Sequence, residues 1–356
     1  MSTLSIDQPG PLREVEALDQ PALQDWLRQA LHQPEGKLDS VAQFPAGSSN
    51  LTYLIEFAGQ PMVLRRPPFG GRGGSAHDMG REHSVLSKIH PLFPLAPEPL
   101  AMCEDSSIIG APFYLMQRLS GVILRREAPS ALADDPQACQ RLCENWIDLL
   151  ARLHDLDIES NDLEALGQPQ GYVARQVAGW NRRYWAARTE DVPEAKELMA
   201  WLETEQPPDR TPAALIHNDY KFDNVVLDPE QPERIIGVLD WEMTTVGDPL
   251  MDLGCSLAYW VEADDNPAFQ AIRMMPTHLP GMLSREQLLL RYCQQRGISE
   301  VSFDFYRIFG LFRLAGIAQQ IYARYVAGHT RDPRFADFGK LVGILIHAAS
   351  QRAGLR

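Results

Sequence analysis

The stretch with the clearest chemical potential runs from Leu215 to Leu227 and reads LIHNDYKFDNVVL. It holds acidic residues, asparagines, a histidine and a lysine, and apolar residues bracket both of its ends. A second apolar segment ends at Asp240. An aspartate at the end of a strand beside a polar loop is well placed to hold Mg²⁺, because this ion prefers one or two carboxylates together with substrate phosphates. The two segments together indicate magnesium-dependent chemistry on a phosphate compound.

Transfer of a phosphoryl group needs a carboxylate near the acceptor hydroxyl, oxygen ligands for a metal, a cation on the phosphates and a lid that excludes water. Asp219 can orient the hydroxyl and accept its proton. Asn224 and Asp240 can hold the metal that bridges the nucleotide phosphates. Lys221, two residues after Asp219, can place positive charge on the transferred group. We therefore predict Asp219 and Lys221 as catalytic residues, and Asn224 and Asp240 as metal ligands.

The order and spacing of these residues resemble a known superfamily. His217-x-Asp219-x-Lys221-x-x-Asn224, followed by Asp240 at the head of Asp-Trp-Glu, resembles the catalytic and metal loops of protein-kinase-like proteins. Within them, the chain resembles the aminoglycoside phosphotransferase family of small-molecule kinases, and most of all the branch related to the kinase-like domains fused to acyl-CoA dehydrogenases. The match runs from about Phe44 to Gly254, and its other segments are 63–68, 81–83, 113–117, 153–155 and 247–254.

The resemblance implies a nucleotide site in the first lobe and a braced catalytic loop in the second. It places a nucleotide-covering turn between the first two strands, a cation on the third strand with a glutamate partner on the next helix, and a hinge that offers backbone groups to the purine edge. It also implies that His217 braces the catalytic loop and that Asp252 stabilises this loop from below. The nucleotide-binding residues that follow are Ser48, Asn50, Val63, Arg65, Glu82, Met116, Gln117 and Leu119.

One position departs from the family pattern. The third strand usually supplies a lysine, whereas Met62–Arg66 offers only arginines. Strand alternation puts Val63 and Arg65 on one face, so Arg65 is the better candidate for the phosphate-binding cation. Arginine is bulkier than lysine and grips oxygens with a planar fork, so the exchange either defines how this branch binds phosphate or alters the nucleotide site.

Candidates for the acceptor site are an aromatic and basic run in the second lobe and one further carboxylate. Trp180, Arg183 and Tyr184 lie on a predicted helix, where they either pack in the core or form a wall of the acceptor pocket. Arginines there would suit an anionic substrate. Glu242, two residues after Asp240, is either a further site carboxylate or an ordinary surface residue.

The elements that must position these residues change character along the chain. Spacing predicts a helix over 15–31, a hairpin from strands at 51–57 and 61–65, a helix over 81–89, and strands at 100–103 and 112–117. From Pro136 onward helices dominate, with a clear apolar face over 139–153 and β-like islands at 224–227 and 235–239. We expect an α+β, two-lobed protein-kinase-like fold, with a small β-rich lobe over residues 1–118 and a larger, mainly helical lobe over 119–356.

Composition narrows the function. The chain has 356 residues, 45% of them hydrophobic, and 33 basic against 47 acidic residues give a formal charge of −14. Broad binding to nucleic acid or to anionic membrane needs a basic face, so neither partner is expected. No apolar run reaches the ~20 residues of a membrane span, and no secretion signal is visible at the start. Five scattered cysteines fit a reduced cytoplasmic compartment.

We therefore predict a kinase that uses ATP or GTP with Mg²⁺ and phosphorylates a hydroxyl of a small molecule, as a monomer or homodimer. The branch resemblance favours a hydroxyacyl or related metabolite as acceptor, with an aminoglycoside as an alternative. Two other functions remain open. One is a non-catalytic nucleotide-binding pseudokinase, which the arginine at position 65 favours. The other is a metal-dependent phosphohydrolase, although a second His–Asp metal pair is absent from the sequence.

Overall fold

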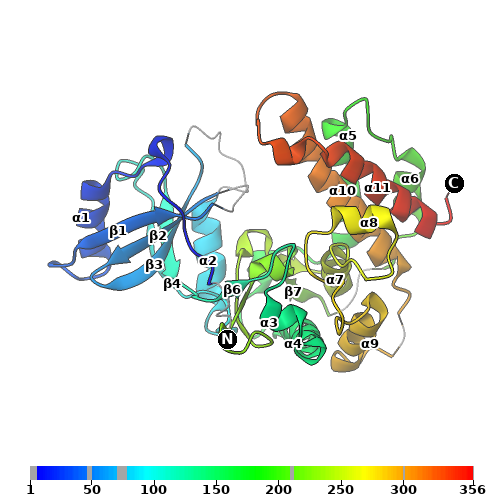
Figure 1. The fold of residues 1–356 in the computed structure, drawn as a ribbon, viewed down its shortest axis with the longest axis horizontal. Helices are drawn as coiled ribbons and strands as arrows, with labels where there is room; N and C mark the ends of the chain where they lie inside the picture. Colours follow the sequence, from blue (N-terminus) through cyan, green and yellow to red (C-terminus); the bar gives the residue numbers. More distant parts are fainter. Residues whose placement is uncertain (1–5, 46–49, 70–77, 209–211, 300, 356) are drawn as a thin grey trace. The chain divides into compact units, whose positions relative to one another are not determined.

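The computed structural model describes residues 6–45, 50–69, 78–208, 212–299 and 301–355 (Figure 1). The chain forms two compact units. Unit 1 comprises Met1–Ile123 and Asn224–Met243, and unit 2 comprises Leu124–Asp223 and Thr244–Arg356. The chain thus returns to unit 1 for the segment 224–243, which a single boundary near residue 118 does not anticipate.

A five-stranded antiparallel sheet forms the body of unit 1, with the strand order β1-β2-β3-β5-β4. The predicted hairpin is present, because β2 pairs with β3 through a turn in which Ala58 and Gly59 both have positive φ. Such a turn matches the twist of the flanking strands. The second predicted pair is also present, as β4 and β5. The five strands are β1 Leu38–Gln43, β2 Leu51–Phe57, β3 Gln60–Arg66, β4 Pro99–Cys103 and β5 Phe113–Gln117.

Two helices pack with this sheet. The expected helix over 15–31 is shorter in the structure, where a 3-10 turn, η1 (Glu14–Glu16), precedes α1 (Gln20–Ala30). The helix begins there because the Asp19 side chain caps the Ala22 amide, and Leu23 and Leu27 bury its apolar side against the strands. The second helix, α2 (Met79–Ile89), is capped by Asp78 in the same way and carries Glu82 on a buried face.

A small three-stranded sheet, in the order β6-β8-β9, completes unit 1. Its strands are β6 (Val122–Ile123), β8 (Val225–Leu227) and β9 (Ile235–Val238), so both predicted β islands are present. A 3-10 turn, η4 (Phe222–Asn224), leads into β8, and another, η5 (Trp241–Met243), follows β9. The Leu239 amide donates to the Asn224 carbonyl at 2.8 Å, which brings Asn224 and Asp240 to the same edge of this sheet.

Helices make up most of unit 2, in which α10 and α11 lie side by side (Figure 1). A short sheet pairs β7 (Ala214–Ile216) with β10 (Thr245–Gly247), and the predicted catalytic residues follow directly after β7. The predicted apolar face over 139–153 lies on α4, where Leu142, Trp146 and Leu150 are fully buried. The helices are α3 Ser130–Ala133, α4 Pro136–His154, α5 Tyr172–Ala187, α6 Lys196–Thr204, α7 Pro249–Leu257, α8 Pro267–Ile272, α9 Arg285–Gln295, α10 Asp304–Val326 and α11 Phe338–Arg352, with 3-10 turns η3 Glu164–Leu166 and η6 Pro333–Phe335.

Helices α7 and α10 cross in backbone contact, at two glycines. A Cβ at Gly310 would lie 2.2 Å from the Gly254 carbonyl oxygen, and a Cβ at Gly254 would lie 2.3 Å from the Tyr306 carbonyl oxygen. Both obstacles are backbone atoms, which cannot move aside as a flexible side chain can. This close crossing matters for the site because α7 carries Asp252.

We expect Gly310→Ala to lower the free energy of unfolding by about 1–3 kcal/mol or more, since the added methyl overpacks the crossing. The matched control is Gly343→Ala in α11, where nothing lies within 4 Å of the new Cβ. This change should be neutral or stabilise by about 0.5–1 kcal/mol. Chemical denaturation of both variants measures the effects, and equal stability of the two would contradict the close crossing.

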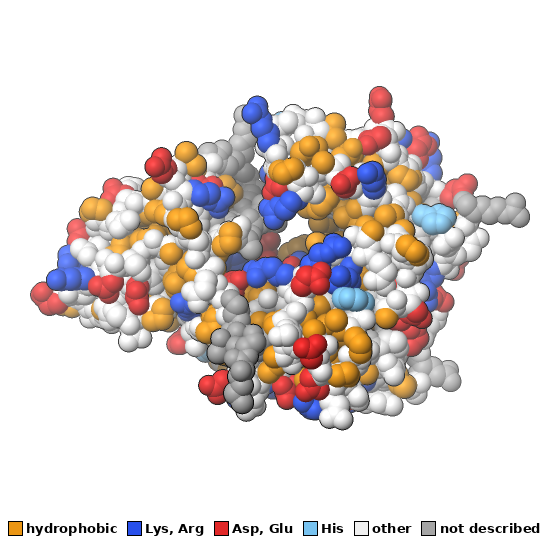
Figure 2. Space-filling model, in the orientation of Figure 1, with side chains coloured by type: hydrophobic (Ala, Val, Ile, Leu, Met, Phe, Trp, Pro, Cys, Tyr) orange, Lys and Arg blue, Asp and Glu red, His pale blue; other side chains and the backbone are white. Residues whose placement is uncertain are grey.

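A sheet-rich unit 1 and a helical unit 2 agree with the predicted α+β class. Within the described part of the chain, no helix is both long and apolar enough to cross a membrane. On the face shown in Figure 2, acidic, basic and apolar side chains are interspersed.

Candidate functional site

One buried carboxylate organises the predicted catalytic segment of unit 2, which contains Asp219 and Lys221. Asp252, on α7, is fully buried and accepts hydrogen bonds from the backbone amides of His217 and Asn218, each at 2.8 Å. Burial would raise the pKa of Asp252, but the bonds from His154 and His217 outweigh it and hold the pKa below its usual value. Asp252 thus contacts the backbone of the loop that it is predicted to support.

His154 and Tyr292 extend this support. The His154 ring lies 3.1 Å from Asp252 through Nε2 and 2.7 Å from the Tyr292 hydroxyl through Nδ1. Burial lowers the pKa of His154, so its ring is neutral. Because the carboxylate only accepts, Nε2 carries the proton and donates to Asp252, and the Tyr292 hydroxyl donates to Nδ1. This series of hydrogen bonds, from Tyr292 on α9 through His154 on α4 to Asp252 on α7, therefore holds the loop in place.

This buried neutral histidine predicts a pH dependence of stability. Below the ordinary histidine pKa of 6.5, His154 of the unfolded chain binds a proton, whereas buried His154 of the folded protein stays neutral. The free energy of unfolding should therefore fall as the pH drops from about 7.5 to 5.5. In His154→Gln, whose amide can replace both hydrogen bonds without titrating, the fall should be smaller. Thermal midpoints across this pH range measure it, with the exposed His329→Gln as control. Parallel profiles for wild type and His154→Gln would show that His154 is not the responsible group.

Asp219 and Lys221 form an ion pair on the loop. The Lys221 ammonium lies 2.8 Å from the nearer Asp219 carboxylate oxygen and 3.9 Å from Asp223. Burial would lower the pKa of Lys221, but Tyr259, Asp219 and Asp223 raise it above its usual value, so the lysine is charged. Both side chains of the pair keep about one sixth of their surface exposed. The carboxylate is therefore anchored yet reachable, as a group that receives a proton must be.

The turn before Asp219 has an unusual backbone. Asn218 has φ +66°, in the left-handed region that few residues other than glycine and asparagine adopt. Two side chains hold it there: the Tyr172 hydroxyl donates to the Asn218 amide oxygen at 3.2 Å, and Arg313 donates to its carbonyl at 2.7 Å. His217 is fully buried and its Nδ1 accepts from the Asp219 backbone amide at 3.3 Å. This is a contact of the kind that the predicted bracing role requires.

In unit 1, Arg65 is the centre of a carboxylate cluster. Its guanidinium bonds to Glu82 on α2 and lies 3.2 Å from Asp240 and 3.4 Å from Glu242. Burial would lower the pKa of Arg65, but these carboxylates, Glu82 first, raise it above its usual value. Burial also raises the pKa of Glu82, and Arg65 opposes this shift. The predicted pairing of Arg65 with Glu82 is therefore present in the structure.

Glu242 joins three elements of unit 1. Its carboxylate accepts from the side-chain amide of Asn50, directly before β2, at 3.0 Å and contacts Arg65 on β3. Its carbonyl accepts from Arg81 on α2 at 2.7 Å. These contacts make Glu242 a brace of unit 1, which neither of the sequence interpretations anticipated. Ser48 lies outside the described residues.

The residues expected around the purine lie on two neighbouring strands and in the segment that follows the second of them. Val63 on β3 faces Met116 on β5 in the strand register, and both are largely buried. Leu119 packs on Gly237, where a Cβ would be 2.3 Å from a Leu119 methyl carbon. The backbone amide of Gln117 donates to the Glu98 carbonyl at 2.8 Å. A purine contact from the Gln117 backbone would therefore use its carbonyl rather than its amide.

Asn224 and Asp240 offer oxygen donors at one edge of the small sheet. Asp240 has φ +66° and a side chain about one third exposed, and Asn224 lies across the strand pair from Leu239. A carboxylate and an amide oxygen, with room for phosphate oxygens and water, fit the preferences of Mg²⁺. Among the described residues, no group of three His, Cys, Asp or Glu side chains forms a cage that would hold a metal by protein ligands alone.

The acceptor candidates on α5 have different surroundings. Tyr184 is fully buried, and its hydroxyl donates to the Pro193 carbonyl at 2.8 Å, so its contacts are those of a core residue. Trp180 is nearly buried, and its ring faces Arg183 on one side and Arg313 of α10 on another. The sequence interpretation did not single out Arg313, because one arginine within the apolar run of α10 matches no motif. A charged residue in such a run is nevertheless a signal, because charged side chains are rarely buried without a partner.

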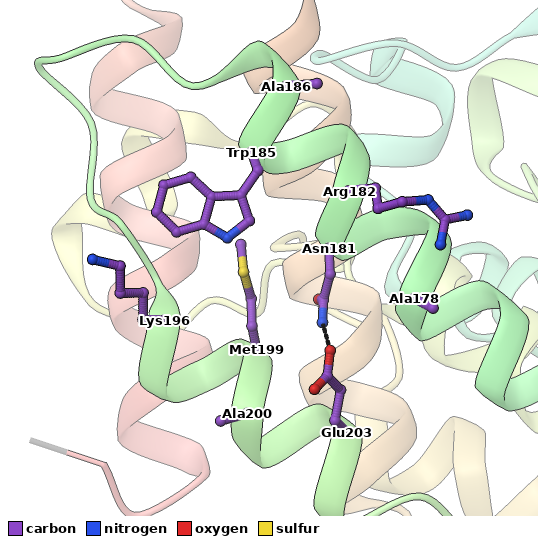
Figure 3. Close-up of a pocket in the computed structure, with 9 residues that line it drawn as sticks. All are labelled: Ala178, Asn181, Arg182, Trp185, Ala186, Lys196, Met199, Ala200 and Glu203. Carbon is purple, nitrogen blue, oxygen red and sulfur yellow. Dashed lines mark hydrogen bonds between the residues drawn. The ribbon is translucent and has the colours of Figure 1, made fainter.

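An open hollow of about 730 Å³ lies between α5 and α6 (Figure 3). Arg182, Trp185 and Met199 line it, together with a hydrogen bond of 2.7 Å between Asn181 and Glu203. Neither Asp219 nor Lys221 takes part in its lining. The hollow is therefore separate from the catalytic segment.

Comparisons with known proteins agree on one family. The family described as "Phosphotransferase enzyme family" matches residues 40–286. Acyl-CoA dehydrogenase family member 11 of Gallus gallus is 36% identical over 94% of this chain, and acyl-CoA dehydrogenase family member 10 of Mus musculus is 33% identical over 95%. The matches cover 44% and 31% of those proteins, so the chain spans less than half the length of these relatives.

Solved structures show the same fold. A putative aminoglycoside phosphotransferase from Ralstonia eutropha has a TM-score of 0.79 and 30% identity, with 95% of this chain and 99% of that chain covered. Choline kinase from Cryptosporidium parvum has a TM-score of 0.65 at 11% identity, with 94% and 96% covered, which speaks for the fold alone. These findings confirm the predicted kinase-like fold, with its sheet-rich first lobe and helical second lobe. The chain belongs to the phosphotransferase enzyme family.

Proposed function

We propose that this chain transfers the γ-phosphoryl group of ATP, or of GTP, to a hydroxyl of a small molecule with the help of Mg²⁺. The observation that carries the proposal is the geometry of the loop at Asp219. Asp252 anchors two consecutive amides of this loop, and Lys221 pairs with a carboxylate that stays reachable. Membership of a phosphotransferase family supports the same reaction.

In unit 2, Asp219 would orient the acceptor hydroxyl and accept its proton as the new oxygen–phosphorus bond forms and the bond to the leaving nucleoside diphosphate breaks. Lys221 holds Asp219 in place and adds positive charge where the phosphoryl group arrives. The backbone strain at Asn218, held by Tyr172 and Arg313, fixes the direction of the carboxylate in advance.

In unit 1, Arg65 would bind the nucleotide phosphates with its planar fork, and Glu82 would hold the fork in position. Asn224 and Asp240 would hold the metal. When bound, Mg²⁺ neutralises charge on the phosphates and keeps them in a fixed geometry. Asn50 and Glu242 brace this lobe, and Val63, Met116 and Leu119 would form the apolar surroundings of the base.

For the acceptor, a hydroxyacyl or related metabolite is supported by relatives named acyl-CoA dehydrogenase family members, in which this chain matches less than half of the protein. Neighbouring structures with kanamycin and hygromycin B keep an aminoglycoside as the alternative, on the ground of fold alone.

The test is a screen of hydroxylated metabolites for acceptor-stimulated formation of ADP or GDP, with and without Mg²⁺. The proposal expects at least one hydroxyl compound to stimulate nucleotide turnover, only with the divalent ion. Nucleotide binding without turnover under any acceptor would favour the pseudokinase. Release of phosphate from a monoester without nucleotide would favour the phosphohydrolase.

A further inference from the structure

Tyr259, which follows α7 in unit 2, lies against the pair formed by Asp219 and Lys221. The Lys221 ammonium lies 5.1 Å from the centre of the Tyr259 ring, within the range of a cation–π contact. The same ammonium lies 2.8 Å from an Asp219 carboxylate oxygen. Because α7 also carries Asp252, which anchors the loop, one helix positions both the loop and the Tyr259 ring.

The Tyr259 hydroxyl has no hydrogen-bond partner among the residues that the structure describes, although the residue keeps only 7% of its surface exposed. A buried tyrosine hydroxyl normally has a partner, because leaving the bond unmade costs free energy. The exception at Tyr259 therefore points to a partner from outside the chain. Partners within the protein are present for the hydroxyls of the buried Tyr53, Tyr114, Tyr172, Tyr184, Tyr220 and Tyr292.

This hydroxyl can be reached, and it carries a proton that it can donate. In the described part of the chain it is not one of the enclosed polar atoms that lack a partner, so its oxygen is in contact with solvent. Burial raises the pKa of Tyr259 to about 12, and the positive charge of Lys221 only partly opposes this shift. The phenol is therefore neutral near pH 7, and it can donate one hydrogen bond to an oxygen atom of a ligand.

We propose that Tyr259 binds the acceptor, and that its hydroxyl donates a hydrogen bond to a second oxygen atom of the compound whose reactive hydroxyl lies at Asp219. The acceptor then belongs to the compounds that carry two oxygens close together, such as diols, sugars and hydroxy acids, rather than to simple monohydric alcohols. This inference rests on the proposed function, because it names the class of compound that receives the phosphoryl group.

The experiment removes one oxygen from the protein and one from the compound. Tyr259→Phe deletes the hydroxyl and keeps the ring that contacts Lys221. The compound pairs are 1,2-propanediol with 1-propanol, 3-hydroxybutyrate with 2-butanol, and D-ribose with 2-deoxy-D-ribose. Binding is measured by calorimetry in the presence of ADP and Mg²⁺, and turnover by ADP formation from ATP.

The matched control is Tyr53→Phe, which makes the same change at a hydroxyl that donates to the Glu16 carbonyl at 2.9 Å in unit 1. This control should lower the thermal midpoint, because a buried hydrogen bond is lost, and should leave acceptor binding unchanged. Tyr259→Phe should do the opposite, with a thermal midpoint close to wild type and weaker acceptor binding. A midpoint lowered as much as in Tyr53→Phe would reveal an internal partner of the Tyr259 hydroxyl and overturn the proposal.

We expect at least one compound with two oxygens to bind, and its affinity or kcat/KM to fall about three- to tenfold in Tyr259→Phe, the scale of one hydrogen bond. Its partner with one oxygen fewer should show a similar loss in the wild-type protein and no further loss in Tyr259→Phe, so the two losses should not add. Equal losses for both members of a pair would mean that the hydroxyl contacts the transferred phosphoryl group instead. That result, or no dependence on Tyr259 for any compound, would overturn the acceptor contact.

The two proposals fail separately. Binding that depends on the Tyr259 hydroxyl, without any phosphoryl transfer, would uphold the acceptor contact and count against the kinase. Phosphoryl transfer with the same constants in wild type and Tyr259→Phe, for every acceptor, would uphold the kinase and overturn the acceptor contact.

Discussion

Replacement of Asp219 by asparagine is expected to lower kcat for phosphoryl transfer by about 10²- to 10⁴-fold, the range that positioned acid–base groups supply. The amide keeps the size of the side chain but cannot accept the proton of the acceptor hydroxyl. It also removes the partner of Lys221, which lies 2.8 Å away. Steady-state kinetics with a working acceptor measures kcat, and nucleotide affinity should stay within a few-fold of wild type.

The control for this prediction is Asp223→Asn. Asp223 lies 3.9 Å from Lys221 and, like Asp219, is two residues away from it in the sequence. The substitution therefore removes one carboxylate beside the same lysine. This substitution should lower kcat far less than Asp219→Asn does, because the proposal assigns no proton transfer to Asp223. Comparable losses in the two variants would mean that the rate depends on the charge of the segment rather than on Asp219.

Asp240→Asn is expected to weaken Mg²⁺-dependent nucleotide binding by about 10- to 100-fold, the scale on which changes around a metal act. The amide is a poorer ligand than the carboxylate, and it also weakens the contact of 3.2 Å with Arg65. Calorimetric titration with ATP, at several Mg²⁺ concentrations, separates the metal-dependent part of the affinity from the rest.

Glu242→Gln is the matched control, since Glu242 also contacts Arg65 and lies two residues away. Its amide can still accept from Asn50, so the Mg²⁺ dependence of nucleotide binding should stay close to wild type. An unchanged Mg²⁺ dependence in Asp240→Asn would exclude Asp240 as a metal ligand.

Much of the local structure could be predicted from the sequence because it is encoded locally. The alternation in 51–57 and 61–65, split by a short turn with Gly59, specifies the hairpin of β2 and β3. The apolar spacing on α4 specifies its buried face. The pairing of Arg65 with Glu82 was implied by the family resemblance, and strand alternation only favoured Arg65 over Arg66.

The supports of the site could not be predicted, because they come from distant parts of the chain. Tyr292 reaches His154 across 138 positions, and Arg313 reaches Asn218 across 95. Only packing decides which tyrosine or arginine arrives there. The grouping of 224–243 with unit 1 follows from β6, a two-residue strand that is too short to give a periodic signal. For Tyr184 the sequence left core packing and the acceptor pocket open, and the structure buries this side chain in the core.

The most direct test of the account follows the γ-phosphate itself. Wild-type protein is incubated with ATP labelled at the γ-phosphate, Mg²⁺ and an acceptor found by the screen, and the labelled products are separated. We predict that the label moves to the acceptor hydroxyl, that omission of Mg²⁺ prevents this, and that Asp219→Asn protein shows almost none. Label found only in inorganic phosphate, or label that stays on ATP with every acceptor, would contradict a phosphotransferase built on Asp219.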